Sequence, residues 1–417
     1  MSDNVADQDA DVVVAGGGIG GLANAYALAS TGHRVRVLEQ AASFEEVGAG
    51  LQLAPNATRI LDEWGMLDEV IAAGVLPRRL VLKDAVDGGE LTSVDLEEDF
   101  RARYGAPYVV IHRSDLLEIL HHHCKEAGVE LTTRSRVDRA ESDDSTASVF
   151  VDGTRHRAGA VLAADGLWSG LRRRFSDDEP ISSGYVAYRG TIPANDVAAM
   201  QVEMSPDDVV AYIGPECHFV HYPLRGGQMF NLVAVFRSPG HLRGEPDWGG
   251  PEELDDAFAR CCDQVRGGTA YLWRDRQWRM FDRLPMDRWV GGRIALTGDA
   301  AHPMLQYLAQ GACQAMEDGY VLSREASIRR AGRSTPWPEV LAAYSAARTG
   351  RTARVQNTAR AWGDLWHCDG LTRRVRNELL RMRDPADYRH LDWLYGPPRS
   401  PQHGATTIDH SHPSSFT

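Results

Sequence analysis

The sequence predicts a mixed α/β fold made of an α/β domain with a parallel sheet, an inserted β-sheet lobe and a set of C-terminal helices. Residues 11–39 have the pattern of a buried strand, a glycine-rich turn, a helix and a second strand, which is a βαβ opening. From about Gly184 to Phe236 the chain becomes rich in short strands separated by glycine turns, which is typical of a second sheet. Residues 293–298 (RIALTG) return to the buried-strand pattern, and the composition is then helical to about residue 395.

The predicted domain boundaries lie where these patterns change. We expect a discontinuous first domain, a discontinuous sheet lobe and a helical region: residues 11–75, 100–180 and 285–325; residues 76–99 and 181–284; and residues 326–395, respectively. The polar ends, residues 1–10 and 396–417, are predicted to be disordered. Apolar spacing predicts an amphipathic helix over residues 56–73, and Ser114 or Asp115 is expected to cap the helix that follows residue 112.

Composition excludes several classes of function. The 417 residues carry a formal net charge of −13, which argues against nucleic-acid binding. The six cysteines form no CxxC pair, and the sequence shows neither a signal peptide nor an apolar run of membrane-spanning length, so we expect a cytoplasmic protein with free thiols. His121, His122 and His123 point in different directions on a helix, so no metal site is predicted.

A glycine loop predicts that the first domain is a Rossmann-like dinucleotide-binding domain. Gly16, Gly18 and Gly21 form G-x-G-x-x-G between a strand and a helix. Glycine allows the tight turn, the approach of the backbone to a pyrophosphate and the close packing of helix on strand, and the helix N-terminus offers N–H groups to the phosphates. Glu39 ends the second strand, where a carboxylate accepts hydrogen bonds from a ribose. This loop alone does not distinguish NAD from FAD.

Two later motifs resemble those of a known family. The segment VLAADGLWSGLRR contains Asp165 and Gly166, and the segment RIALTGDAAHP contains Gly298 and Asp299. With the glycine loop, and in this order, they resemble the single-component FAD-dependent aromatic hydroxylases, the group A flavoprotein monooxygenases that include para-hydroxybenzoate hydroxylase. The resemblance implies that family's fold, FAD as cofactor, and NADH as an electron donor that binds transiently. No second G-x-G-x-x-G occurs in the sequence, in agreement with a donor that has no Rossmann domain of its own.

The resemblance implies roles for further residues. Beyond the glycine loop and Glu39, the implied cofactor-binding residues are Gly50, Arg113, Asp165, Asp299, Pro303, Gly311 and Ala312. In the family, the aspartate at position 299 binds the ribityl chain, and the arginine at position 113 pairs with a cofactor phosphate. Gly311 and Ala312 begin a helix, preceded by Gln310, whose N–H groups face the flavin N1–C2=O edge and stabilise the negative charge of the reduced flavin. Pro303 shapes the loop at the isoalloxazine, and Gly48 and Gly50 lie in a loop that permits the flavin to move.

Three segments resemble the 3-hydroxybenzoate 6-hydroxylase branch of this family: IGPECHFVHYPLRGG, HPMLQYLAQGA and ARAWGDLWHCDG…RNELLRMRD. The branch implies hydroxylation of a phenolic acid para to its hydroxyl, giving gentisate from 3-hydroxybenzoate with O₂ through a flavin C4a-hydroperoxide, in aromatic catabolism. Residues 218, 220 and 222 alternate on a strand, so His218 and Tyr222 are expected to line one cavity. A neutral His218 is expected to accept the phenol proton, Gln306 to orient that oxygen, and Tyr222 to hold a polar edge of the substrate.

Several alternatives stay open at this point. Arg189 is a candidate for binding the substrate carboxylate, but it could instead stack near the flavin. Salicylate 1-hydroxylase and a biosynthetic hydroxylase of a related phenolic acid are rival activities, and an FAD-binding reductase or redox sensor without oxygenase activity is a rival of another class. The C-terminal tryptophans Trp362, Trp366 and Trp393 predict either a homodimer interface or packing within the chain.

Overall fold

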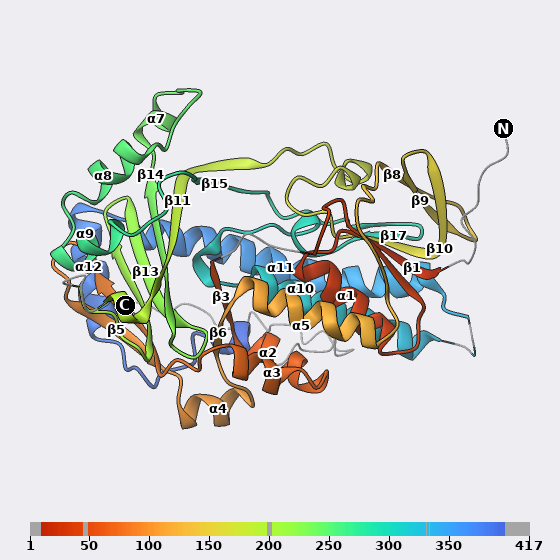
Figure 1. Ribbon diagram of the computed structural model, residues 1–417, viewed down its shortest axis with the longest axis horizontal. Coiled ribbons are helices and arrows are strands. Elements are labelled where there is room, and N and C mark those ends of the chain that lie inside the picture. Colours follow the sequence, from red (N-terminus) through yellow and green to blue (C-terminus); the bar gives the residue numbers. More distant parts are fainter. Residues whose placement is uncertain (1–9, 45–48, 198–201, 331, 333, 397–417) are drawn as a thin grey trace, which may run out of the picture.

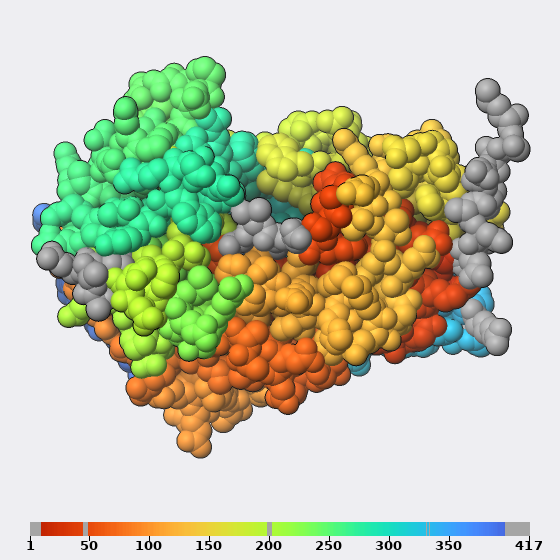
Figure 2. All heavy atoms as spheres, in the orientation of Figure 1, coloured from red at the N-terminus to blue at the C-terminus, as the bar shows by residue number. Residues whose placement is uncertain are grey.

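The computed structural model describes residues 10–44, 49–197, 202–330, 332 and 334–396. Two lobes lie side by side in Figure 2: the green and teal residues of the sheet lobe on the left, and mostly red and yellow residues of the first domain on the right. The predicted disorder of residues 1–9 and 397–417 falls outside the described residues, as does Gly48. The first strand begins at Ala10, so the predicted disordered N-terminus was one residue too long.

The first domain is built on an eight-stranded sheet with a parallel centre (Figure 1). The order is β16-β17-β10-β1-β2-β7, with β9 against β10 and β8 against β9. The strands are β1 Ala10–Ala15, β2 Val35–Leu38, β7 Glu130–Thr132, β8 Arg139–Ser142, β9 Ala147–Val151, β10 Thr154–Ala163, β16 Val290–Gly291 and β17 Ile294–Leu296. Since β1, β10 and β17 are parallel, their carboxyl ends lie at one edge, and the three sequence motifs follow directly after these ends.

The helices of this domain are α1 Ile19–Ala29, α2 Pro55–Glu63, α3 Leu67–Ala73, α4 Glu98–Tyr104, α5 Arg113–Glu126 and α10 Gly311–Arg329. The single helix predicted over residues 56–73 is wrong: it is divided into α2 and α3, because the chain turns at Gly65 with φ +72°. The predicted cap of α5 is also wrong. The N-cap residue is His112, whose Nδ1 accepts a hydrogen bond from the Ser114 amide at 3.3 Å.

The sheet lobe is a seven-stranded sheet of order β15-β11-β14-β13-β12-β4-β5, in which β12 and β4 are parallel neighbours. Its strands are β4 Arg79–Asp84, β5 Glu90–Asp95, β11 Ile181–Pro193, β12 Asp208–Gly214, β13 Cys217–Leu224, β14 Met229–Arg237 and β15 Trp278–Asp282. They come from the two segments that the sequence assigns to this lobe; the exact domain boundaries stay a prediction. The lobe also contains α6 Ala194–Val197, α7 Pro239–Leu242, α8 Pro251–Phe258 and α9 Asp263–Thr269. Its outer face packs against α8 and α9 in an apolar core.

A long helix connects the two lobes (Figure 1). Helix α11, Trp337–Trp366, begins with Trp337 against Gly159 of β10, where a Cβ would meet the indole Nε1 at 2.7 Å. It ends beside β13 of the sheet lobe, and α12 Gly370–Arg381 and α13 Asp392–Tyr395 follow. Arg373 and Asn377 of α12 donate hydrogen bonds to the buried carboxylate of Asp84 at the end of β4. The C-terminal helices thereby fasten the inserted sheet to the first domain.

Two further elements lie between the lobes, the strands β3 Gly50–Leu53 and β6 Val109–His112, which pair with each other. Short 3₁₀ turns, η1 Leu171–Arg174, η2 Gly298–Ala300 and η3 Gln306–Leu308, follow β10 and β17. Among the described residues, no helix combines the length and the apolar character needed to cross a membrane.

Candidate active site

The glycine loop after β1 leaves no space for side chains. Gly16 has a φ of +112°, and a Cβ there would overlap the Ala164 carbonyl of the strand-end turn after β10. A Cβ at Gly21 would overlap the carbonyl oxygen of Gly16. Gly18 is the N-cap of α1 and has no side-chain cap, so the first-turn N–H groups point out of the helix toward the loop. These groups are arranged to bind a pyrophosphate.

The carboxylate of Glu39 lies beside this loop at the end of β2. It accepts hydrogen bonds from the Gly17 amide at 2.6 Å and from the Ala41 amide at 2.7 Å. Asp165, after β10, accepts a hydrogen bond from the Ser169 hydroxyl at 2.6 Å and one from the Leu171 amide at 3.2 Å. Both predicted carboxylates therefore stand at the carboxyl edge of the sheet, where they also organise the turns that surround the site.

Helices α1 and α10 lie side by side and run in parallel. A Cβ at Gly20 would lie 3.2 Å from the Cβ of Ala315. Four residues further along both helices, a Cβ at Gly319 would lie 3.1 Å from the Cα of Asn24. Asn24 also donates a hydrogen bond to the Ala315 carbonyl at 3.2 Å. Because the helices are parallel, their N-termini open at the same side of the molecule, so two positive dipole ends point to one region. Glycine at these contacts permits the close approach.

A buried carboxylate on α10 stabilises the turn that carries Asp299. Asp318 of α10 accepts hydrogen bonds from the Gly298 amide at 2.9 Å, the Thr297 hydroxyl at 3.1 Å and His302 Nε2 at 2.7 Å. Burial raises the pKa of the Asp318 carboxyl, but the charges of His302 and Arg348 outweigh that effect and hold the pKa well below its usual range. Asp299 itself is exposed on the turn, as a residue that meets a ligand must be.

The same carboxylate belongs to a buried ionic cluster between α10 and α11. Arg348, 1% exposed, donates to Asp318 at 2.8 Å and also binds Glu317, which is bonded in turn to Arg351 and to Asn56 of α2. The sequence predictions missed Asp318 and Arg348. The available signal was the Glu-Asp pair in the middle of an otherwise ordinary helix, since buried carboxylates require a cation.

The remaining cofactor positions predicted from the sequence surround this turn. Gly311 and Ala312 form the first turn of α10, whose N-cap Gln310 makes no side-chain cap bond. Ala309 adopts the left-handed conformation, with φ +51°, and so turns the chain from η3 into α10. Pro303 is buried, and its carbonyl accepts a hydrogen bond from Gln356 Nε2 at 3.0 Å. Arg113 begins α5, and its amide donates to the Ala49 carbonyl at 3.2 Å.

One face of the sheet lobe is turned toward this region. His218, Val220 and Tyr222 of β13 share that face, and strand pairing aligns Val220 with Val233 of β14 and through it with Arg189 of β11. His218 and Tyr222 are separated by four residues along the strand, which is about 13 Å. They therefore stand at opposite ends of the face and can contact opposite ends of one ligand.

Tyr222 of the sheet lobe packs against β3, the strand that contains Gly50 of the predicted flavin loop. Its ring lies over Gly50, where a Cβ would be only 2.5 Å from the ring carbon Cε2. The Gly50 amide donates to Asn231 Oδ1 of the neighbouring strand at 2.8 Å. Burial raises the pKa of Tyr222, and the nearby cation of Arg189 lowers it to a smaller extent, so the hydroxyl is protonated and can donate a hydrogen bond. Gly50 is required here for close approach.

His218 lies at the other end of the face, inside an aromatic enclosure. It is 2% exposed and packs against Tyr307 of η3 at 5.6 Å and Trp366 of α11 at 5.2 Å between ring centroids. Its Nδ1 is 2.8 Å from Nε2 of His367, a partner that the sequence did not predict. Burial lowers the pKa of His218 to about 3, so this imidazole is a weaker base than the unperturbed one assumed from the sequence. Gln306, half-buried, precedes Tyr307 in η3.

Arg189 is half-buried on the same face, and its guanidinium carbon lies 5.3 Å from the ring centroid of Trp278 on β15. The aromatic partner of this stack is therefore a residue of the sheet lobe. The tryptophans Trp362 and Trp366 pack in an apolar cluster with Leu305 and Tyr307, which favours packing within the chain for these two residues. Among the described residues no cluster of side chains suited to a metal ion is found.

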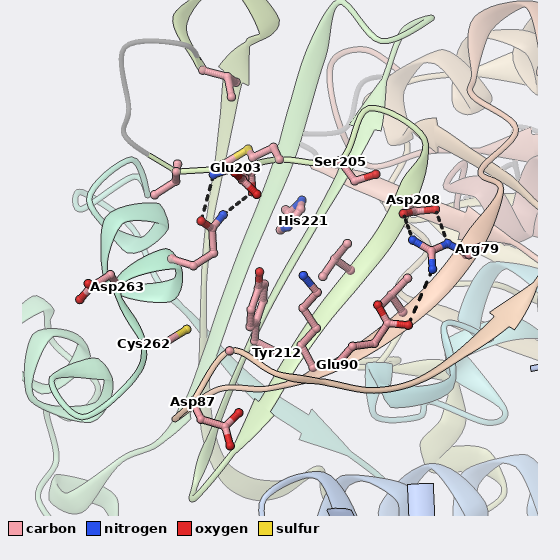
Figure 3. A pocket seen from close by; sticks show the side chains of 18 residues that line it. Arg79, Asp87, Glu90, Glu203, Ser205, Asp208, Tyr212, His221, Cys262 and Asp263 are labelled. Atoms are coloured by element: carbon pink, nitrogen blue, oxygen red, sulfur yellow. Dashed lines mark hydrogen bonds and ion pairs between the residues drawn. The ribbon is translucent and has the colours of Figure 1, made fainter. Parts of the chain in front are cut away.

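A cavity of about 1130 Å³ lies on the outer face of the same sheet (Figure 3). Its lining includes Arg79, which binds Asp208 at 2.8 Å and Glu90 at 3.7 Å, and it includes His221 of β13. His221 is 1% exposed, and neither ring nitrogen has a hydrogen-bond partner among the described residues. The predicted catalytic residues do not line this cavity: on the opposite face His218 packs against η3 and α11 and Tyr222 packs against Gly50, while Gln306 belongs to η3.

Taken together, the glycine loop, the exposed Asp299 and the two parallel helix N-termini define a flavin-dinucleotide site. Comparison with known proteins agrees: residues 9–359 match the model of the FAD binding domain family. The chain is 39% identical to 3-hydroxybenzoate 6-hydroxylase of Polaromonas naphthalenivorans over 95% of its own length and 98% of the relative's. It is 37% identical to 3-amino-4-hydroxybenzoate 2-monooxygenase of Streptomyces cremeus, over 94% of this chain and 96% of that one.

A solved structure has the same fold. Klebsiella pneumoniae HpxO, crystallised with FAD and uric acid, superposes with a TM-score of 0.78 at 25% identity, over 93% of this chain and 97% of that chain. The protein therefore belongs to the FAD-dependent aromatic hydroxylases, and its cofactor is FAD. It is a flavin-dependent aromatic monooxygenase, as the resemblance of its motifs implied.

Proposed function

We propose that this protein hydroxylates 3-hydroxybenzoate para to its hydroxyl and releases gentisate, consuming one NADH, one proton and one O₂ and forming NAD⁺ and water. The observation that carries the proposal is the inner face of the sheet lobe, which presents His218 at one end and Tyr222 at the other, with Arg189 level with the middle of the face and its charge acting on Tyr222. The 39% identity to a 3-hydroxybenzoate 6-hydroxylase along nearly the whole chain supports the choice of substrate.

In the proposed site the chain's own residues bind and polarise the substrate. FAD bound at this site would supply the electron transfer from the nicotinamide and the activation of O₂. The flavin would be held by the glycine loop, Glu39 and Arg113 at its phosphates and ribose, and by Asp299 and the N-terminus of α10 near its ring. Pro303, Gly311 and Ala312 shape that end of the site, and Gly50 and Asp165 border it. Position at the carboxyl edge of the sheet supports the roles of the glycine loop, Glu39, Asp165 and Asp299, and the resemblance to the family supports the others.

The substrate would lie with its carboxylate toward Arg189 and Tyr222, which supply a cation and a neutral hydroxyl donor. Its phenol would lie toward His218 and Gln306. Because the pKa of His218 is about 3, the imidazole accepts a hydrogen bond and shares the proton but does not remove it completely. A more phenolate-like oxygen raises the electron density of the ring at the para carbon, where the new oxygen is added. Tyr307 and Trp366 exclude water from this end.

A panel of hydroxybenzoates, scored for NADH oxidation, O₂ uptake and product, tests the proposal. Gentisate from 3-hydroxybenzoate is the expected outcome, and catechol from salicylate would establish the rival 1-hydroxylase. The panel includes 3-amino-4-hydroxybenzoate, because the 37% identity to an enzyme named for that substrate makes a biosynthetic hydroxylase the second candidate. Absence of substrate-stimulated NADH oxidation with the whole panel would contradict all three activities.

The site assignment has its own test in His218→Ala and Gln306→Ala. Both variants should bind FAD and accept electrons from NADH, because the glycine loop and Asp299 are unchanged. Hydroxylation should fall by about 10²–10⁴, the usual contribution of acid–base assistance, and H₂O₂ should form in its place. Hydroxylation by His218→Ala at the wild-type rate and coupling would show that His218 is a core residue.

We also propose that the protein forms a homodimer in a cytoplasmic setting. On α12 the exposed apolar side chains Leu371, Val375 and Leu379 lie on one side of the helix, at four-residue spacing, and are 51–76% exposed. This stripe is a better candidate interface than Trp366, which is buried within the chain.

A further inference from the structure

The bond between His218 and His367 joins the sheet lobe to the end of α11. The ring nitrogens are 2.8 Å apart, the ring centroids are 5.0 Å apart and the planes differ by 17°, which is the geometry of an in-plane hydrogen bond between two imidazoles. His367 directly follows the last residue of α11. Its other side packs on Tyr185 of β11, at 4.4 Å between ring centroids.

Both rings of this pair are neutral. Burial lowers the pKa of His218 to about 3, and burial together with His218, Arg376 and Arg237 holds the pKa of His367 well below its usual range. A neutral imidazole has one N–H and one lone pair, so one ring must donate in this bond and the other must accept. The direction of the bond therefore decides which nitrogen of His218 carries its proton.

The two directions have opposite consequences for the substrate. If His218 donates from Nδ1, its Nε2 is a bare acceptor, and the proton of His367 then lies on its Nδ1, which is buried without a hydrogen-bond partner among the described residues. If His367 donates, His218 Nε2 carries the proton and cannot accept one from a phenol. We propose that His367 is a positioning residue: it accepts the Nδ1–H of His218 and so fixes the tautomer whose Nε2 receives the phenol hydrogen bond. This inference rests on the role of His218 proposed above.

The packing explains why the end of α11 can perform this task. Tyr307, which contacts both imidazoles, lies so close to α11 that a Cβ at Gly363 would be 2.5 Å from its ring. The His367 carbonyl accepts a hydrogen bond from the Glu216 amide at 3.0 Å, which fixes the turn beside β13. Both ring planes are thus fixed by their neighbours, and rotation of His218 away from His367 is opposed by Trp366 at 5.2 Å.

The tautomer can be read directly, without turnover, in the FAD-loaded protein labelled with ¹⁵N-histidine. Nitrogen shifts and one-bond couplings distinguish a protonated Nδ1 from a protonated Nε2, and His218→Gln assigns the signal. We expect His218 to carry its proton on Nδ1 in the wild-type protein. A proton on Nε2 would overturn the proposal, whatever the activity.

Two substitutions of His367 test whether this residue fixes the tautomer of His218. His367→Gln keeps a carbonyl acceptor for Nδ1–H, whereas His367→Phe keeps a flat ring against Tyr185 and removes the acceptor. In His367→Phe we expect loss of the Nδ1–H signal, a smaller phenolate-like shift in the absorption of bound 3-hydroxybenzoate, and a fall of about 10- to 100-fold in the rate of hydroxylation, with little change in KM. His367→Gln should recover most of each effect. An unchanged Nδ1–H signal in His367→Phe, or equal loss in both variants, would reject the role.

The matched control is His221→Phe, on the same strand but on the opposite face. This histidine is equally buried, has no hydrogen-bond partner among the described residues and borders the cavity of Figure 3, which gives the larger ring space. The control should leave the His218 tautomer and the rate unchanged. The substrate panel, His218→Ala and His367→Phe give distinguishable failures. A panel without gentisate contradicts the proposed function, normal hydroxylation by His218→Ala contradicts the role of His218, and a wild-type tautomer in His367→Phe contradicts only the role of His367.

Discussion

Replacement of Arg348 by methionine should destabilise the protein strongly and loosen its hold on FAD. Arg348 is 1% exposed and binds Asp318 at 2.8 Å and the Gln314 side chain at 2.8 Å. Removing one partner of a buried ion pair costs about 3–5 kcal/mol, because a charge stays buried without compensation. Glu317 retains Arg351 and Asp318 retains His302, so we expect about 3 kcal/mol, the lower end of that range.

The pH dependence gives this prediction a second signature. In the folded wild type the pKa values of Asp318 and Glu317 are both lowered, so their stabilising contribution is present above the unfolded value of about 4 and is lost as the pH falls through the folded values. Without Arg348, burial raises the pKa values of Asp318 and Glu317. As the pH falls, protonation of these carboxylates therefore removes the cost of their uncompensated buried charge in the variant. The loss in free energy of unfolding of Arg348→Met relative to the wild type should therefore be largest at pH 7 and become smaller toward pH 4.

Urea unfolding followed by circular dichroism, with release of FAD followed by fluorescence, measures both effects. The control is Arg274→Met, which breaks a pair with Asp255 that is 38% and 61% exposed and should cost no more than about 1 kcal/mol. A loss in Arg348→Met equal to that of the control, or a deficit that grows as the pH falls, would refute the argument that Asp318 depends on a buried cation.

Four further predictions concern the cofactor, the substrate, the donor and assembly. Gly21→Ala should yield a folded but colourless protein, because a Cβ overlaps the Gly16 carbonyl; a yellow protein with bound FAD would contradict the loop geometry. Tyr222→Phe should raise the apparent KM for the phenolic acid more than it lowers kcat, and an unchanged KM would place the carboxylate elsewhere. Coupled turnover should prefer NADH to NADPH in a direct comparison of the two. Light scattering should report a dimer, and Leu379→Glu on the exposed stripe of α12 should shift it to a monomer; a monomeric wild type rejects the interface.

The motifs predictable from the sequence are those whose chemistry is local. Gly16 and Gly21 are constrained by backbone contacts within a few residues, so their pattern identifies the loop before any tertiary contact is known. Glu39 was predicted at the end of β2 and lies there, bonded to the loop. The break at Gly65 was also local and could have been predicted, since a glycine between two short amphipathic segments often ends a helix.

His367 could not have been found in this way, because it lies 149 residues from His218 and meets it only through the course of α11. Arg348 and Asp318 are 30 residues apart on two helices, and their pairing depends on how those helices cross.

The sequence by itself determined the βαβ opening, the order of the cofactor motifs and the face of β13 on which His218 and Tyr222 lie, since these follow from backbone periodicity and from glycine positions. The tertiary structure alone decided that His218 is a weak, neutral base with an imidazole partner, and that Asp318 supports the turn of Asp299. The physical reason is that burial and charge pairing are sums over side chains from distant segments. The pKa of a buried group and the direction of its hydrogen bonds therefore exist only after the chain has folded.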